Sequence, residues 1–380
     1  MNTGTELHPF EIHIPDEAIR RLQDRLADTR FPERETVDDW SQGIPLDYTK
    51  HLCAVWGKEY DWRRVESELN ARDQWITRID GLDVHFLHVR SARHDARPLL
   101  VTHGWPGSVI EALDVIDGLV DPPADQPAFH LVLPSLPGYG FSGKPARPGW
   151  NLTRIADAWA ELMARLGYDR FLAQGGDWGA QVTTTLALRH PDRVAMMHTT
   201  VPWAPRPDGV TDDELTDVER QWLAERAEFV RTGLGYAIEQ STRPQTLGYA
   251  LTDSPVGQLA WIAEKYFEFT DHDGTPESAV PLNRVLDTVS LYWFTATGTS
   301  SARMYWESHG AIDMVTPVTV PTGVSVFPRD LMKLPRAWTA ARYRDLRHWR
   351  ALPRGGHFAM LEVPDVFVDE VRTCFAGAPR

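Results

Sequence analysis

Cysteine is scarce in this chain, which has only Cys53 and Cys374 among its 380 residues. Two thiols so far apart indicate neither a disulfide framework nor a zinc site, and we expect both to be buried as small apolar side chains. Long apolar runs are also missing, since no stretch approaches the roughly twenty apolar residues of a membrane span. Residues 1–10, MNTGTELHPF, lack the basic, apolar start of a secretory signal. We therefore expect a soluble protein of a reducing, cytoplasmic compartment.

The chain is also poor in positive charge. It has 39 Lys and Arg against 53 Asp and Glu, which gives a net charge of −14. Such a balance disfavours nucleic acid or an anionic membrane as a partner. The glycine clusters at 175–179 and 355–356 have neither GxGxxG nor Walker spacing, and we expect no nucleotide cofactor. Apolar residues make up 42% and charged residues 24%, as in globular proteins. At 380 residues the chain exceeds one ordinary core, which predicts a main domain with inserted or appended pieces.

The motif richest in chemical information is GGDWG, residues 175–179. It has the spacing of a nucleophile elbow, the sharp turn between a strand and a helix, with Asp177 where esterases carry serine. Gly175 and Gly179 suit that turn, because small residues on both sides keep the strand and the helix from colliding. The alternative is that Asp177 only caps the following helix.

A carboxylate nucleophile restricts the reactions that can turn over. When it displaces a leaving group from an alkyl carbon, it forms an ester that water can later split at the carboxyl carbon. A serine would leave a stable ether. The expected electrophiles are therefore epoxides or alkyl halides rather than ordinary esters.

Water attack on that ester needs a general base, and we predict His357, which lies in the glycine turn RGGHF near the C-terminus. The acid that orients this histidine usually follows the preceding strand. Residues 315–328 contain a predicted strand, and Asp330 comes directly after it. Asp313 and Asp345 are weaker alternatives because each precedes a strand, and Asp330 itself could be a solvated loop carboxylate.

Four residues are candidate donors to oxygen atoms that become negative during such a reaction. The backbone N–H groups of Trp105, in the HGWPG sequence after a predicted strand, and of Trp178 are predicted to form an oxyanion hole for the hydrolysis step. Tyr236 and Tyr305 are candidates to protonate the alkoxide of an opened epoxide. On the sequence alone, each tyrosine is more typical of a packing aromatic than of a catalytic residue.

Several segments together resemble the microsomal type of epoxide hydrolase over nearly the whole chain. They are HGWPGS, LPGYGFS (136–142), GGDWGA, TDSPVG (252–257), VPTGVSVFP and RGGHF, with residues 8–15 and 60–63 similar to the N-terminal domain of that family. The resemblance implies an aspartate nucleophile at Asp177, an acid at Asp330, a base at His357 and lid tyrosines at Tyr236 and Tyr305. Mammalian members carry glutamate at the acid position and an apolar N-terminal anchor. We therefore expect altered kinetics from Asp330 and no membrane anchor.

The expected fold class is α/β, an α/β-hydrolase fold with a mostly parallel central sheet, a helical lid insertion and an N-terminal extension. Residues 15–30 and 48–60 have helical periodicity, residues 75–89 form a hairpin at the edge of the sheet, and strands are expected near Pro98, Phe129, Arg170, Val194, Pro317 and Leu346. The predicted divisions are an N-terminal domain at 1–95, the core at 96–201 and 311–380, and the lid at 202–310.

The function we predict is cofactor-independent hydrolysis of a hydrophobic epoxide by water to a vicinal diol. The lid aromatics either line an apolar pocket or pack the lid onto the core; they are Trp261, Tyr266, Phe267, Phe269, Tyr292, Trp293 and Phe294. The alternatives are a haloalkane or haloacetate dehalogenase and a catalytically silent ligand-binding protein. A homodimer is one open oligomeric state, and detoxification, catabolism and secondary-metabolite synthesis all remain open roles.

Overall fold

The computed structural model describes residues 6–379, apart from the side chain of Asp212. Residues 1–5 lie outside the described residues. They are part of the expected N-terminal domain and of the segment in which we expect no membrane anchor. Within residues 6–379, no helix is both long enough and apolar enough to span a membrane. Cys53 and Cys374 are buried and unpaired with each other, as predicted.

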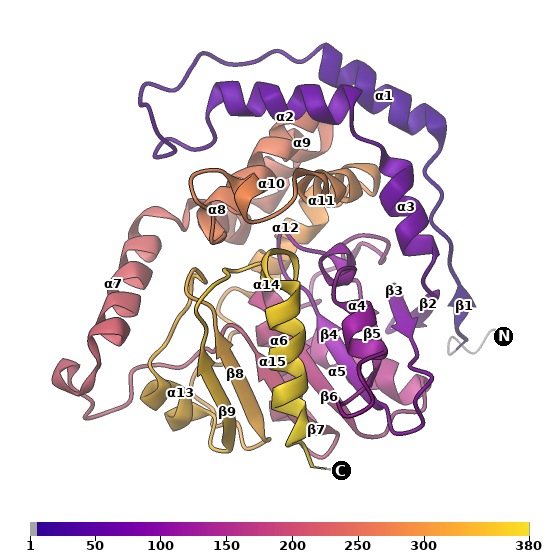
Figure 1. Cartoon of the computed structure of the whole chain (residues 1–380). Coiled ribbons are helices and arrows are strands. Elements are labelled where there is room, and N and C mark those ends of the chain that lie inside the picture. The colour runs from indigo at the N-terminus through magenta and orange to yellow at the C-terminus, as the bar shows by residue number, and fades with distance from the viewer. Residues whose placement is uncertain (1–5, 380) are drawn as a thin grey trace.

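The centre of the molecule is a nine-stranded sheet with the order β1-β2-β3-β5-β4-β6-β7-β8-β9 (Figure 1). The strands are β1 (His8–Pro9), β2 (Gln74–Ile79), β3 (Leu82–Val89), β4 (Arg97–Thr102), β5 (Phe129–Pro134), β6 (Phe171–Gly175), β7 (Val194–Thr199), β8 (Thr322–Val326) and β9 (Leu346–Ala351). From β5 to β9 neighbouring strands run parallel, whereas β1, β2, β3 and β5 pair antiparallel. The mostly parallel α/β-hydrolase sheet is therefore confirmed.

Two predictions about strands need correction. The β2–β3 hairpin turns at Asp80 and Gly81 as expected, but β1 pairs outside it, so the hairpin is not the edge of the sheet. A strand of two residues is too short to show periodicity in a sequence. The strand expected near Pro317 begins at Thr322, because prolines at 317 and 321 cannot donate to a ladder.

Helices cover both faces of the sheet, and the strands alternate their side chains between two cores. In β4, Leu100 packs with α5 (Leu152–Arg165) and α6 (Asp177–Arg189), while Leu99 and Val101 pack with α4 (Ile116–Val120) and α15 (Pro364–Ala376). This is the period of two expected for a sheet buried on both sides. The short helices α13 (Arg336–Arg342) and α14 (Ala359–Glu362) lie in the C-terminal part.

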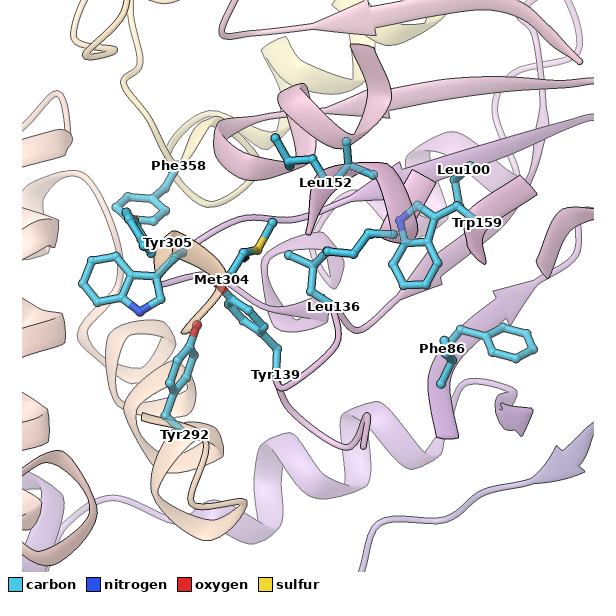
Figure 2. Packing of buried hydrophobic residues seen from close by; sticks show 14 of the residues in the cluster. Phe86, Leu100, Leu136, Tyr139, Leu152, Trp159, Tyr292, Met304, Tyr305 and Phe358 are labelled. Carbon is cyan, nitrogen blue, oxygen red and sulfur yellow. Dashed lines mark hydrogen bonds between the residues drawn. The ribbon is translucent and has the colours of Figure 1, made fainter. Parts of the chain in front are cut away.

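The lid is a group of helices between β7 and β8. Its members are α7 (Asp217–Thr232), α8 (Gly235–Thr242), α9 (Pro244–Asp253), α10 (Pro255–Phe269), α11 (Leu282–Phe294) and α12 (Gly298–Ser308). Figure 2 shows that the core continues into it: Trp159 and Leu136 lead to Tyr139, which lies near Tyr292 and Tyr305 of the lid. The predicted helical character of residues 202–310 is confirmed; the domain boundaries stay predictions.

The N-terminal helices α1 (Asp16–Ala27), α2 (Leu46–Lys58) and α3 (Trp62–Asn70) lie against the outside of the lid (Figure 1). The indole N–H of Trp56 donates to the hydroxyl of Ser290 at 2.8 Å. Arg64 pairs with Asp287, whose side chain is fully buried in α11. Polar contacts this deep fix the lid between the N-terminal helices and the sheet.

Candidate active site

Asp177 occupies the turn between β6 and α6 with a φ of +48°. A Cβ at Gly175 would lie 2.1 Å from the carbonyl oxygen of Gly179, and a Cβ at Gly179 would lie 1.9 Å from that of Thr102. Only glycine fits at either position, which explains the spacing of the motif. The capping alternative for Asp177 is wrong, because Gly176 is the N-cap and no side chain caps α6.

The structure brings Asp177, His357 and Asp330 together at the carboxyl ends of the parallel strands. The Nε2 atom of His357 lies 3.3 Å from Oδ2 of Asp177, and its Nδ1 lies 3.1 Å from Oδ1 of Asp330. The side chains of His357 and Asp330 are buried, while that of Asp177 is 23% exposed, so the nucleophile is the most accessible of the three. The rival acids lie elsewhere, with Asp313 bonded to its own turn and Asp345 paired with Arg347.

The two carboxylates dominate the electrostatics of the histidine. Burial disfavours the charged imidazole, but Asp330 and Asp177 outweigh that effect and raise the pKa of His357 well above its ordinary value. The C-terminus of the lid helix α10 also holds the turn that carries this residue, since the N–H of His357 donates to the carbonyl of Phe269 at 2.9 Å.

The loop after β4 reaches the nucleophile through its backbone. The N–H of Trp105 donates to Oδ1 of Asp177 at 2.8 Å. This approach requires Gly104, where a Cβ would lie 2.1 Å from the same oxygen. The N–H of Trp178 belongs to the first turn of α6, where backbone donors have no partner within the helix. Its indole packs edge-on against Tyr305 at 4.8 Å.

Tyr236 of α8 and Tyr305 of α12 lie close together, with ring centroids 6.0 Å apart. Both are buried, and the ring of Tyr236 stacks on Trp105 at 5.1 Å. Burial first and then the charge of Asp177 raise the pKa of Tyr236, and the same charge contributes at Tyr305. Both phenols therefore stay protonated and can donate hydrogen bonds.

A cavity of about 220 Å³ lies between the nucleophile and the lid. Asp177, His357 and both tyrosines reach it, and most of the remaining lining is apolar: Trp178, Val201, Trp203, Phe229, Leu234, Ile312, Leu331 and Met332. None of the seven lid aromatics singled out in the sequence lines this cavity. Tyr266, Phe269 and Tyr292 are buried in the core instead, and Trp40 stacks on Phe267 at 3.9 Å. The packing interpretation is the correct one for these residues.

Glu111, a buried carboxyl group close to the nucleophile, is not among the residues predicted from the sequence. It lies in the short helix Val109–Ala112 and, with Asp177 and His357, lines a second cavity of about 20 Å³. Burial raises its pKa to about 8. A Cβ on Gly107 would overlap its Oε1 atom at 1.6 Å, so Gly107 makes room for the carboxyl group. A glutamate between apolar residues, in HGWPGSVIEAL, is the signal that could have revealed it.

Among the described side chains, no group of three or more His, Cys, Asp or Glu is arranged to hold a metal ion.

Comparisons with known proteins agree with this geometry. Residues 7–112 match the family described as Epoxide hydrolase N terminus, and residues 97–250 match the alpha/beta hydrolase fold. The chain is 33% identical to Epoxide hydrolase 1 of Sus scrofa over 401 residues, which cover 96% of this chain and 88% of the relative. It is 51% identical over 371 residues to a Stigmatella aurantiaca protein whose assignment as an epoxide hydrolase is itself provisional, covering 97% of this chain and 84% of that protein.

Solved structures give the same picture. The epoxide hydrolase of Aspergillus niger superposes with a TM-score of 0.91 at 33% identity, covering 98% of this chain and 97% of that structure. The juvenile hormone epoxide hydrolase of Bombyx mori superposes with a TM-score of 0.92 at 29% identity, covering 98% and 94%. With an elbow aspartate, a paired histidine, two facing tyrosines and relatives matched over most of their length, the chain belongs to the epoxide hydrolase family.

Proposed function

We propose that this protein converts hydrophobic epoxides to vicinal diols through an ester on Asp177. The observation that carries the proposal is the environment of that carboxylate. One oxygen accepts the N–H of Trp105, the other lies 3.3 Å from Nε2 of His357, and two tyrosines line the apolar cavity in front of the carboxylate. The carboxylate attacks a ring carbon, and Tyr236 and Tyr305 protonate the oxygen that leaves.

The second step begins when the ester removes the negative charge of Asp177. That charge is one of the causes that raise the pKa of His357, so alkylation lowers the pKa and lets the imidazolium release its proton to solvent. Neutral His357, oriented by Asp330, then takes a proton from water as the water attacks the carboxyl carbon. The N–H groups of Trp105 and Trp178 stabilise the resulting oxyanion.

The attacking water has a natural place in the small cavity behind Asp177. Its volume of about 20 Å³ suits roughly one water molecule. Glu111 and His357 both line it, so a water there can bond to a carboxyl group and to the base at once. We assign Glu111 the role of holding this water. The substrate enters from the opposite, apolar side.

The test is mass spectrometry of the His357→Gln variant after incubation with styrene oxide. Without the base the ester should accumulate, giving an adduct of the intact epoxide mass on a peptide that contains Asp177. Asp177→Asn is the matched control and should give no adduct. If the variant carries no adduct and the wild type forms no diol from a broad epoxide panel, the proposal is wrong; halide release from haloalkanes would then identify a dehalogenase.

A further inference from the structure

The lid contains a buried cation that the two steps above do not use. Lys265 lies on α10 with 3% of its surface exposed. Its ammonium pairs with Glu264 at 2.9 Å and with Glu268 at 2.7 Å. The same nitrogen lies 4.4 Å from the ring centroid of Tyr236. A buried ammonium needs compensating charges, and the two carboxylates provide them.

The face of α10 that carries Lys265 also reaches the base. Lys265 and Phe269 are four residues apart, so they share one face of the helix. The ring centroid of Phe269 lies 5.9 Å from that of Tyr236 and 5.4 Å from that of His357. One helix face therefore contacts both the proposed proton donor and the proposed base.

We propose that Lys265 is a positioning residue that acts on Tyr236 through the face of the phenol ring. The ammonium holds the ring in the orientation that it has against Trp105. It also attracts the negative charge that spreads into the ring when the hydroxyl gives up its proton. This inference rests on the proposed function, since Tyr236 must donate that proton.

Both steps conserve atoms and charge. An oxygen of Asp177 forms a bond to the ring carbon, the epoxide C–O bond breaks with its electron pair on oxygen, and that oxygen takes the proton of Tyr236. In the second step water gives one proton to His357, which passes it to the alkoxide released from the ester. The other proton of that water, freed when Asp177 returns to a carboxylate, restores Tyr236.

Charges on two elements, α6 and α10, face the phenol. After burial itself, the causes that raise the pKa of Tyr236 are Asp177 across the cavity and then Glu268 and Glu264, while the hydrogen bond with Tyr305 lowers it. The neighbouring carboxylates therefore disfavour the phenolate form of Tyr236. Lys265, at the ring face, is the cation that counters them.

The test compares Lys265→Met, which is similar in length and neutral, with Lys265→Arg, which keeps the charge. Single-turnover rates of ester formation and ester hydrolysis are measured on styrene oxide and on 3,3,3-trifluoro-1,2-epoxypropane, whose alkoxide needs less protonation. We expect Lys265→Met to slow ester formation about tenfold with styrene oxide and much less with the fluorinated epoxide. Hydrolysis should keep its rate, and Lys265→Arg should recover most of the loss.

A double-mutant cycle shows whether the effect passes through Tyr236. In a Tyr236→Phe background, which retains Tyr305, Lys265→Met should cause no further loss. Equal losses on both substrates, a loss that persists in that background, or slowed hydrolysis would each overturn the inference. Should Lys265→Met fail to fold, Lys265→Gln undergoes the same measurements. A wild type that makes no diol would refute the proposed function instead, whereas an active wild type beside an indifferent lysine variant would refute only this inference.

Discussion

Single glycines set the distance between the backbone and the nucleophile. A methyl group at Gly104 would lie 2.1 Å from Oδ1 and 2.4 Å from Cβ of Asp177 and so displace the nucleophile, whereas one at Gly179 would meet the backbone of Thr102. We expect Gly104→Ala to lose about a hundredfold in the rate of ester formation, because the nucleophile is displaced. Gly179→Ala should instead lower the yield of folded protein. Thermal melts and single-turnover rates test both, and a fully active Gly104→Ala would contradict the argument.

The protonation of Glu111 predicts a stability that depends on pH. Its pKa rises from 4.5 in the unfolded chain to about 8 in the folded protein. Between these values the folded state binds a proton that the unfolded state has released, so the free energy of unfolding falls as pH rises through this window. Glu111→Gln lacks that loss.

The Tm difference between Glu111→Gln and the wild type should therefore grow in favour of the variant from pH 5 to pH 9. Taking the difference between the two proteins removes the contribution of the groups they share. A Tm difference that is independent of pH would show that Glu111 ionises in the folded protein as it does in the unfolded chain.

At the scale of elements, the decisive contact is the one between α3 and α11. Asp287 has no exposed side-chain surface, and it accepts a hydrogen bond from Tyr60 at 2.6 Å besides pairing with Arg64 and Arg284. Removing one partner of a buried pair leaves the others uncompensated. We expect Asp287→Asn to cost about 2 to 4 kcal/mol of unfolding free energy, measured by urea denaturation.

The matched control is Asp217→Asn on α7. Asp217 also pairs with an arginine, Arg220, but its side chain is 96% exposed. Exposed pairs contribute about 0 to 1 kcal/mol, so this variant should unfold at nearly the wild-type urea concentration. Equal losses in the two variants would mean that burial does not decide the contribution of Asp287.

Elements whose information is local could be predicted from the sequence. The elbow at Asp177 and the turn at Asp80 and Gly81 depend on a few adjacent residues, and the structure has both where the sequence places them. The structure also brings the predicted Asp330 and His357 together, because strand order fixes where each strand ends.

What the sequence could not give depends on the packing of distant segments. Lys265 looks like an ordinary charged residue until the fold buries it beside Tyr236, and the apolar neighbours of Glu111 do not indicate that it lies close to Asp177. The strand β1 acquires its structure from β2 alone. For the same reason the sequence left two roles open for the lid aromatics, since helical periodicity does not distinguish a face that packs from one that lines a cavity.

For the molecule as a whole, the volume of the reaction cavity limits the substrates. At about 220 Å³ it is smaller than the roughly 300–1,000 Å³ of cavities that bind drug-sized ligands. We expect kcat/KM to fall from styrene oxide to the bulkier trans-stilbene oxide by about tenfold or more, since the larger epoxide must displace packed side chains. Diol formation from both, measured side by side, is the check. Equal kcat/KM values would mean that the cavity expands when a ligand binds.

Contacts from the N-terminal segment limit how the lid can be exchanged for that of a relative. In this protein Trp56 and Arg64 reach from α2 and α3 into α11, and Trp40 covers Phe267 of α10. A transplanted lid keeps these contacts only if it carries residues that match Trp56, Arg64 and Trp40. A chimera that is to keep its substrate range should therefore exchange the lid together with the N-terminal helices.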